Sequence, residues 1–216
     1  MTASLPTVAV VDYGAGNLRS VTKALERSGA RAEVVADPEG LRAADAVVLP
    51  GAGAFADAAN SLRDKGLAEA IVESIDSGTP YLGLCLGLQL LFDESDEHGV
   101  TRGLGVLPGR VERFREKDAN GEVLRVPHIG WNAVRFCGEH PVLAPLADGN
   151  CFYFVHSYRA VPAREGDTVG WTSYGGEFAA AVARGNVVAV QFHPEKSQAA
   201  GKKLLDAFVD WVAACE

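Results

Sequence analysis

The chain has 216 residues, of which 48% are hydrophobic and 22% are charged, and its formal net charge is -8. The acidic balance gives a nucleic-acid-binding role little electrostatic support, and no apolar run is long enough to span a bilayer. The first residues lack the basic and apolar regions of a signal peptide. The four cysteines are widely spaced and form no CxxC pair, and the five histidines show no metal-ligand spacing. We therefore expect a cytoplasmic protein without a metal or other cofactor, with no nucleic-acid or membrane partner.

The first half of the sequence alternates strand and helix signals. Apolar, β-branched runs predict strands at 7–11, 31–35, 45–50 and 81–85. Helical patterns fill the intervals 17–28 and 54–77, and the second is interrupted near Gly66. Apolar strands separated by helices are typical of a mostly parallel sheet that is covered on both faces.

The second half of the sequence consists mainly of short strand-like runs between turn residues. They are GVLPGRVERF (105–114), EVLRVP (122–127), WNAVRF (131–136), NCFYFVHSYRAV (150–161), TVGWTSY (168–174), FAAAVARG (178–185) and VVAVQFHPE (187–195). No comparable helical pattern returns before 197–214. We expect one domain over residues 1–216, in which antiparallel strands extend the parallel sheet.

Cys85 lies between two glycines in Gly83-Leu-Cys-Leu-Gly87, a thiol version of the nucleophile-elbow pattern. Glycines two positions before and after the turn relieve crowding around a nucleophile at a sharp strand-to-helix turn. The following run, LGLQLLF, predicts an apolar helix whose N-terminus would favour the thiolate. The alternative is a structural cysteine buried in an apolar strand.

A nucleophile needs a base and a group that orients the base. His193-Pro-Glu195 directly follows the strand-like run VVAV, and Pro194 favours an extended conformation at His193. His193 could accept the Cys85 proton while Glu195 holds the imidazole. The alternative for this tripeptide is a plain turn.

Leu49-Pro-Gly-Ala-Gly53 follows the third predicted strand, where its backbone N–H groups could face a developing oxyanion. Residues 51–56 also fit G-x-G-x-x-A, a dinucleotide-binding pattern. That interpretation is disfavoured because the pattern follows the third strand, Pro50 interrupts the turn, and no well-placed acidic residue ends a following strand. A plain tight turn is the remaining alternative.

The sequence contains the motifs PGAG, GLCLG and HPE in this order. In this it resembles the class I (triad-type) glutamine amidotransferases, and the resemblance spans essentially the whole chain. Six segments resemble one branch of that family, the glutaminase subunits of imidazole glycerol phosphate synthase: DYGAGNL, LPGAGAFADA, GLCLGLQLLFDESDE, PHIGWN, FYFVHSY and QFHPEKSQ. The resemblance implies a flavodoxin-like three-layer α/β fold with a mostly parallel central sheet and added antiparallel strands.

The resemblance also implies a role for each matching residue. Cys85 would attack the side-chain amide of L-glutamine to give a glutamyl thioester and ammonia, with His193 shuttling the proton and Glu195 orienting it. The oxyanion hole would be formed by Gly51, Ala52, Gly53 and the N–H of Leu86. The family commonly has valine at the position of Ala52, so we expect altered mobility of this loop.

Glutamine-binding positions of the family match Gln89, Glu97, His156, Ser157 and Tyr158. Two of these residues have simpler explanations. Glu97 lies in the acidic run DESDE and could belong to a solvated face, and His156 could be a satisfied core histidine.

A partner is implied as well: a (β/α)8-barrel cyclase subunit that forms a heterodimer with the glutaminase and receives its ammonia. The cyclase would make imidazole glycerol phosphate and an aminoimidazole carboxamide ribotide in L-histidine biosynthesis. Residues that match positions near the interface or the ammonia exit are Asn17, Trp131, Tyr153 and Lys196. The alternatives are a glutaminase for another synthase, such as those making anthranilate, GMP or pyridoxal phosphate, a γ-glutamyl peptidase, or a catalytically inactive binding module.

Overall fold

Nine strands form the larger of two sheets in this computed structural model, which describes residues 5–117 and 120–215. Their order is β2-β1-β3-β4-β13-β12-β11-β8-β9. The first five in this order are all parallel: β2 (Arg31–Val35), β1 (Thr7–Val11), β3 (Ala46–Leu49), β4 (Tyr81–Leu84) and β13 (Val187–Val190). Antiparallel pairing continues through β12 (Glu177–Arg184), β11 (Thr168–Ser173), β8 (His128–Phe136) and β9 (Asn150–His156). The expected parallel sheet with added antiparallel strands is confirmed.

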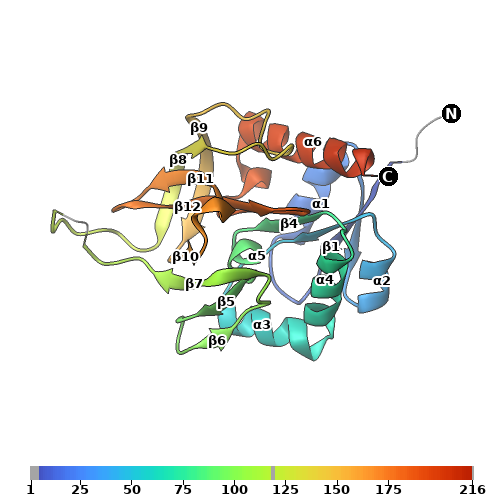
Figure 1. The fold of residues 1–216 in the computed structure, drawn as a ribbon, viewed down its shortest axis with the longest axis horizontal. Coiled ribbons are helices and arrows are strands. Elements are labelled where there is room, and N and C mark those ends of the chain that lie inside the picture. The colour runs from blue at the N-terminus through green and yellow to red at the C-terminus, as the bar shows by residue number, and fades with distance from the viewer. Residues whose placement is uncertain (1–4, 118–119, 216) are drawn as a thin grey trace.

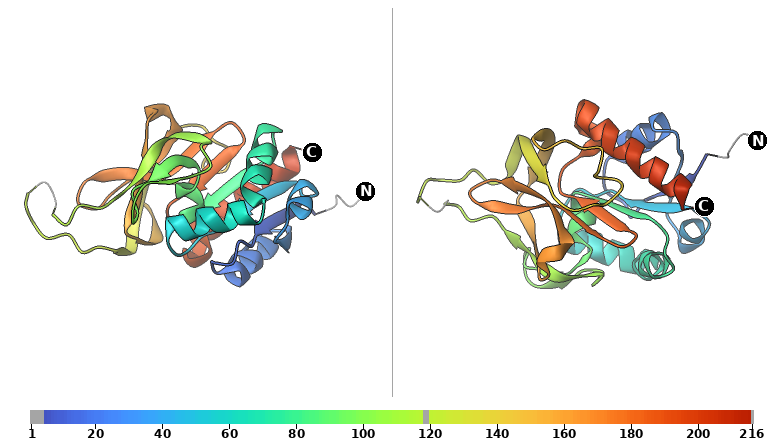
Figure 2. Two further views of the ribbon diagram at one scale, coloured as in Figure 1. Left: turned by 90° about the horizontal axis from the view of Figure 1, so that it is seen from below. Right: turned by 45° about the horizontal axis from the view of Figure 1, so that its top comes forward.

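Helices cover both faces of the parallel part of this sheet (Figures 1 and 2). Alternating side chains of β1 point to opposite faces, as the pleat requires. Val10 packs in one core with Leu25 of α1 (Leu18–Arg27) and Phe208 of α6 (Gln198–Ala214). Val11 packs in the other with Leu62 of α3 (Phe55–Asp64), beside α2 (Pro38–Arg42) and α4 (Leu67–Asp76). This is the three-layer arrangement that the family resemblance implied.

The helix predicted after Cys85 is much shorter than expected. α5 (Leu86–Gln89) makes one turn, and the chain then enters β5 (Phe92–Ser95). β5 belongs to a second, four-stranded sheet of order β10-β7-β5-β6, with β6 (Thr101–Arg102), β7 (Leu107–Arg113) and β10 (Tyr158–Pro162). Pairing of Phe92 with Leu107 buries both side chains, so tertiary contacts override the local helical pattern.

The strand predicted at 122–127 is also wrong. Within the described residues of the segment between β7 and β8, Val123 makes an isolated bridge to Lys117 and its side chain is 79% exposed. This segment projects from the body of the molecule (Figure 1); Leu124 and Val126 pack partly against the core, whereas Val123 stays exposed. The run 150–161 divides at Ser157, which separates β9 in the large sheet from β10 in the small one.

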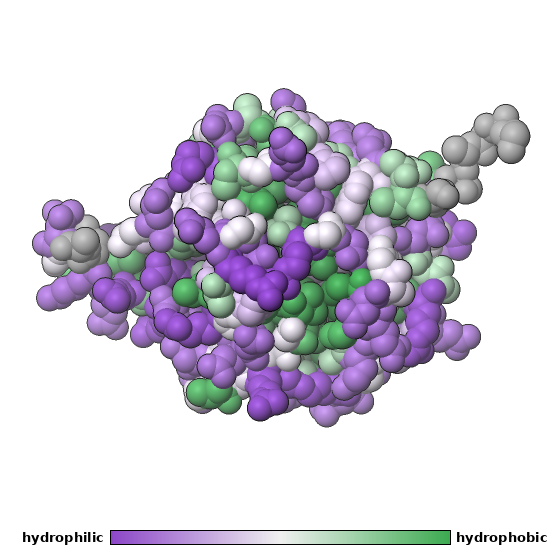
Figure 3. Space-filling view, in the orientation of Figure 1, coloured by the Kyte–Doolittle hydropathy of each residue, from purple (hydrophilic) through white to green (hydrophobic). Residues whose placement is uncertain are grey.

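The interruption predicted near Gly66 is present, because Gly66 adopts a left-handed conformation (φ 67°) between α3 and α4. Short 3-10 turns lie at η1 (Glu165–Asp167) and η2 (Pro194–Lys196). Among the described residues, no helix has the combined length and apolarity needed to cross a membrane. Side chains that protrude from the face in Figure 3 are mainly hydrophilic, in keeping with the net charge of -8.

Candidate active site

A pocket of about 350 Å³ lies at the carboxyl ends of three neighbouring parallel strands. Gly51 follows β3, Cys85 follows β4 and His193 follows β13, and these strands are adjacent in the sheet. Carboxyl ends of parallel strands are where α/β proteins gather binding groups. The sheet order therefore brings together three segments that are far apart in the sequence.

Cys85 occupies a conformation that non-glycine residues rarely adopt, with φ 53° and ψ -104°. Its N–H donates to the carbonyl of Val190 at 2.8 Å, which fixes the turn to β13. A Cβ on Gly87 would lie 1.9 Å from the carbonyl oxygen of Leu49, and one on Gly83 would lie 2.6 Å from the Gly87 oxygen. The two glycines thus permit the close backbone approach on which this turn depends.

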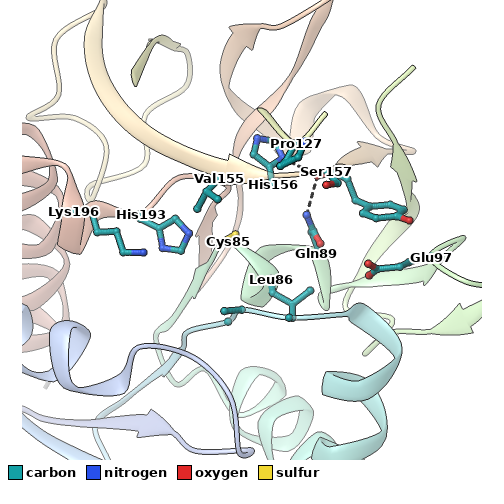
Figure 4. Close-up of a pocket in the computed structure, with 14 residues that line it drawn as sticks. Cys85, Leu86, Gln89, Glu97, Pro127, Val155, His156, Ser157, His193 and Lys196 are labelled. Atoms are coloured by element: carbon teal, nitrogen blue, oxygen red, sulfur yellow. Dashed lines mark hydrogen bonds between the residues drawn. The ribbon is translucent and has the colours of Figure 1, made fainter. Parts of the chain in front are cut away.

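His193 lies on the same side of the pocket as Cys85, as Figure 4 shows. Its Nδ1 is 2.9 Å from Oε1 of Glu195, whose side chain is 2% exposed. Burial alone would lower the pKa of His193, but its contacts with Cys85 and Glu195 outweigh burial and raise the pKa to about 9. Ser197 donates to the carbonyl of His193 at 2.6 Å and accepts the N–H of Tyr153 at 3.0 Å, which holds this turn in place.

The residues predicted for the oxyanion hole, Gly51, Ala52, Gly53 and Leu86, all line this pocket. A Cβ on Gly51 would lie 2.4 Å from Cβ of Leu86, so the two segments are in direct contact. Leu86 is the first residue of α5, and its N–H therefore has no acceptor within the helix. Because α5 has a single turn, its dipole gives less support to a thiolate than the predicted longer helix would.

Tyr13 is a buried neighbour of this loop that sequence reasoning did not single out. Burial raises the pKa of its hydroxyl to about 12; the nearby backbone of Ala52 opposes this effect, and Cys85 adds to it. Within the described part of the chain, no atom completes a hydrogen bond of good geometry with the Tyr13 hydroxyl. Its position near Cys85 follows from the pairing of β1 with β3 and of β3 with β4, which local sequence signals do not reveal.

The residues predicted to bind glutamine also line the pocket: Gln89, Glu97, His156, Ser157 and Tyr158. Gln89 donates from Nε2 to the carbonyl of Tyr158 at 2.9 Å. Oε2 of Glu97 accepts the N–H of Phe55 at 2.6 Å, so this carboxylate caps the start of α3. Glu97 is therefore more than a solvated acid, although the neighbouring Glu94 is exposed.

His156 is buried in a cluster of aromatic rings and hydrogen bonds. Its Nδ1 donates to the carbonyl of Tyr158 at 2.7 Å, which leaves Nε2 to accept from Nδ1 of His128 at 3.1 Å. Burial lowers the pKa of His128 to about 4; burial also lowers that of His156, to about 3 despite the Tyr158 carbonyl. Both rings are therefore uncharged near neutral pH, and His156 is a satisfied buried histidine that also forms one wall of the pocket.

Three of the four residues predicted for a partner interface form one surface group. Trp131 is 49% exposed and packs edge-to-face with Tyr153, whose ring lies 5.9 Å from Nζ of Lys196. Ile129 is 59% exposed and lies two residues before Trp131 on β8, and Lys196 also lines the pocket. Asn17 has a local role, because its side chain caps α1 by accepting the N–H of Ser20 at 3.3 Å.

Two further residues line the pocket, and one is buried behind Cys85, although no sequence motif predicted them. Pro127 and Val155 contribute to its wall. Gln191 is fully buried and donates from Nε2 to Sγ of Cys85 at 3.5 Å. Its place two residues before His193, on the same side of an extended chain, is the signal that could have identified it.

The model of the family "Glutamine amidotransferase class-I" matches residues 9–211. Two solved structures share the fold. "Structure of PurLQS from Thermotoga maritima" has a TM-score of 0.76 and 22% identity, covering 96% of this chain and 99% of the other. "Crystal structure of glutamine amidotransferase" has a TM-score of 0.72 and 24% identity, covering 95% and 98%. The chain belongs to the class I glutamine amidotransferase family.

Relatives within this family agree on a more specific branch. The imidazole glycerol phosphate synthase subunit HisH of Methylococcus capsulatus is 50% identical over 212 residues, which cover 96% of this chain and 97% of the relative. HisH subunits of Syntrophotalea carbinolica and Geobacillus thermodenitrificans are each 48% identical, over 94% and 97% of this chain and 99% and 98% of the relatives. The resemblance inferred from the six segments is thereby confirmed.

Proposed function

We propose that this chain is the glutaminase subunit of an imidazole glycerol phosphate synthase and acts in L-histidine biosynthesis. The observation that best supports the activity is that Cys85 and His193 line one pocket while Glu195 holds the His193 ring from behind. Relatives named HisH, at 48–50% identity over nearly the whole chain, support the choice of synthase.

Cys85 is the nucleophile and His193 is its base. Since the pKa of His193 is raised to about 9, the imidazole can hold the Cys85 proton at neutral pH, as its bond to Glu195 stabilises the cation. The thiolate attacks the side-chain carbonyl carbon of glutamine, the C–N bond breaks, and His193 gives its proton to the departing ammonia. Water then hydrolyses the thioester to glutamate and restores the thiol.

The oxyanion formed during attack needs N–H donors beside Cys85. Leu86, the first residue of α5, supplies one N–H group. The segment from Gly51 to Gly53 supplies others, and its first residue, Gly51, contacts Leu86. In this proposal, these N–H groups stabilise the tetrahedral intermediates of both steps.

Glutamine would be held on the wall formed by Gln89, Glu97 and the segment from His156 to Tyr158. Both Nε2 hydrogens of Gln89 are used within the protein, so its Oε1 is the atom available to accept from a substrate N–H group. Glu97 adds a negative charge that would attract the α-ammonium group. The pocket volume of about 350 Å³ suits a small ligand.

The ammonia acceptor would be a (β/α)8-barrel cyclase subunit in a heterodimer with this chain. Trp131, Tyr153 and Lys196 form a partly apolar surface that adjoins the pocket, which suits an interface through which ammonia leaves. Asn17, at the start of α1, is assigned to the same interface. We further propose that residues 1–216 act as one domain in the cytoplasm, where the four free cysteines would stay reduced.

The test is to mix the chain with cyclases or synthases of several pathways and measure glutamine-dependent product. Only the imidazole glycerol phosphate cyclase should receive ammonia from this chain. Transfer to the anthranilate, GMP or pyridoxal phosphate enzymes would favour the first alternative. Rapid cleavage of γ-glutamyl peptides without a partner would favour a γ-glutamyl peptidase.

A further inference from the structure

Gln191 has an unusual environment for an uncharged polar residue. It follows β13, is fully buried, and its backbone N–H donates to the carbonyl of Ala180 at 2.8 Å. Its neighbour Phe192 points into the apolar core, where it stacks on Phe152 with ring centroids 4.0 Å apart. Gln191 therefore faces the pocket side, next to Cys85, with no freedom to turn toward solvent.

Hydrogen bonds fix which end of the Gln191 amide faces the sulfur. The Tyr158 carbonyl can only accept, so it takes one N–H of Gln89 Nε2 at 2.9 Å. The second N–H of Gln89 is directed at Oε1 of Gln191 at 3.0 Å. If the Gln191 amide turned over, two NH₂ groups would face each other, so Nε2 of Gln191 is held toward Sγ of Cys85.

We propose that Gln191 is a positioning residue for the nucleophile: its Nε2–H, locked in direction by Gln89, holds Sγ of Cys85 and favours the thiolate. The contact is 3.5 Å long, which is ordinary for a hydrogen bond to sulfur. A donor stabilises a charged acceptor more than a neutral one, so the bond strengthens when the Cys85 proton moves to His193. In the absence of a long helix after Cys85, this amide supplies part of the stabilisation that a helix N-terminus would give.

The arrangement also links substrate binding to the nucleophile. Gln89 lies on the wall proposed to bind glutamine, and the same side chain orients Gln191. Displacing Gln89 would release the Gln191 amide and weaken its bond to Sγ. This inference rests on the proposed function, in which Cys85 is the nucleophile.

The test is the rate at which iodoacetamide alkylates Cys85 in the full-length chain, followed by mass spectrometry of the peptide that contains Cys85. Gln191→Met keeps the length of the side chain but removes its donor and acceptor. We expect alkylation near pH 7 to slow about tenfold and to recover at higher pH, the size of one lost hydrogen bond to a charged group. Gln198→Met makes the same change at an exposed position and should react at the wild-type rate.

Turnover of glutamine in the complex with the cyclase gives a second readout. Gln191→Met should lower kcat about tenfold and change KM less than twofold, because the residue acts on the nucleophile. If Gln191→Met does not fold, Gln191→Glu is the variant to measure. It keeps the acceptor for Gln89 but removes the amide donor to Sγ, and it should also slow alkylation. Wild-type alkylation at all pH values in a folded variant would overturn the proposal, whatever the chain's glutaminase activity.

Discussion

Nδ1 of His193 lies 2.9 Å from Oε1 of Glu195, and the two residues are separated only by Pro194. The short 3-10 turn η2 lets a strand-end histidine and its carboxylate partner face each other across one proline. Ser197 ties the carbonyl of His193 to the backbone of β9. These contacts fix the orientation of His193.

The pairing of these residues predicts a pH-dependent contribution to stability. Because the folded pKa of His193, about 9, is above the ordinary 6.5, its protonation stabilises the fold fully below about pH 6.5. That contribution is lost as the pH rises through about 9. Glu195→Gln removes one cause of the raised pKa, so it should cost more unfolding free energy near pH 6 than near pH 10.

Chemical denaturation of wild type and Glu195→Gln at several pH values measures this difference. Glu69→Gln, at an exposed carboxylate, is the control and should show a difference that does not vary over the same range. A constant cost of Glu195→Gln at all pH values would show that Glu195 does not support the charged imidazole.

The close packing around Gly87 predicts that even an alanine at this position severely lowers stability. A Cβ at this position would lie 1.9 Å from the carbonyl oxygen of Leu49, and backbone atoms cannot move aside without separating β3 from α5. Gly87→Ala should lower the unfolding free energy by about 3 kcal/mol or more. Gly166→Ala, where nothing lies within 4 Å of the added carbon, should change it by about 0.5 kcal/mol or less. Equal stabilities of the two variants would refute this account of the turn.

The buried pair of His128 and His156 predicts sensitivity to acid. The folded pKa values, about 4 and 3, are below the ordinary 6.5, so the unfolded chain binds more protons between these limits. Stability should therefore fall as the pH drops from about 6.5 to 4, by up to about 1.4 kcal/mol per pH unit for each ring. His128→Phe keeps the stacking on Tyr174 and should make this fall shallower, whereas His98→Asn, at an exposed position, should not.

Glu97 is predicted to serve both the fold and the substrate. The residue before α3, Ala54, has no side chain to cap the helix, and Glu97 supplies the missing acceptor for Phe55. Glu97→Ala should cost about 1 kcal/mol of unfolding free energy and raise KM for glutamine in the complex. Glu94→Ala, on the same strand–loop segment but exposed, should do neither. Loss of stability without a change in KM would restrict Glu97 to its capping role.

Elements of the first half were predictable because their signals are local. The strand at 7–11 and the interruption of the helical region at Gly66 appear as expected. The strand that begins at Phe92 was not predictable from local signals, since it forms by pairing with β7, where Leu107 is the partner of Phe92. The strand predicted around Val123 is wrong, because Val123 makes an isolated bridge to Lys117, belongs to neither sheet and stays exposed.

The candidate site shows the same division. Cys85, His193 and Glu195 lie in short motifs, so the residue types alone suggested their chemistry. Gln191 lies beside Cys85, and Tyr13 lies beside the backbone of Ala52, because of the order of strands in the sheet. Their neighbours come from positions far away in the sequence, and a single sequence does not state that order.

If Cys85 is the nucleophile, it forms a glutamyl thioester that acid quenching can trap. The chain is mixed with the cyclase, its ligand and glutamine, quenched within the first turnovers and analysed by mass spectrometry. We expect one glutamyl group on the Cys85 peptide of the wild type and none in Cys85→Ser. This variant should still bind the cyclase and support its reaction with added ammonia. Cys151→Ser, at an exposed cysteine, is the control and should keep the adduct. Glutamine-dependent product from Cys85→Ser at the wild-type rate would show that Cys85 is not the nucleophile.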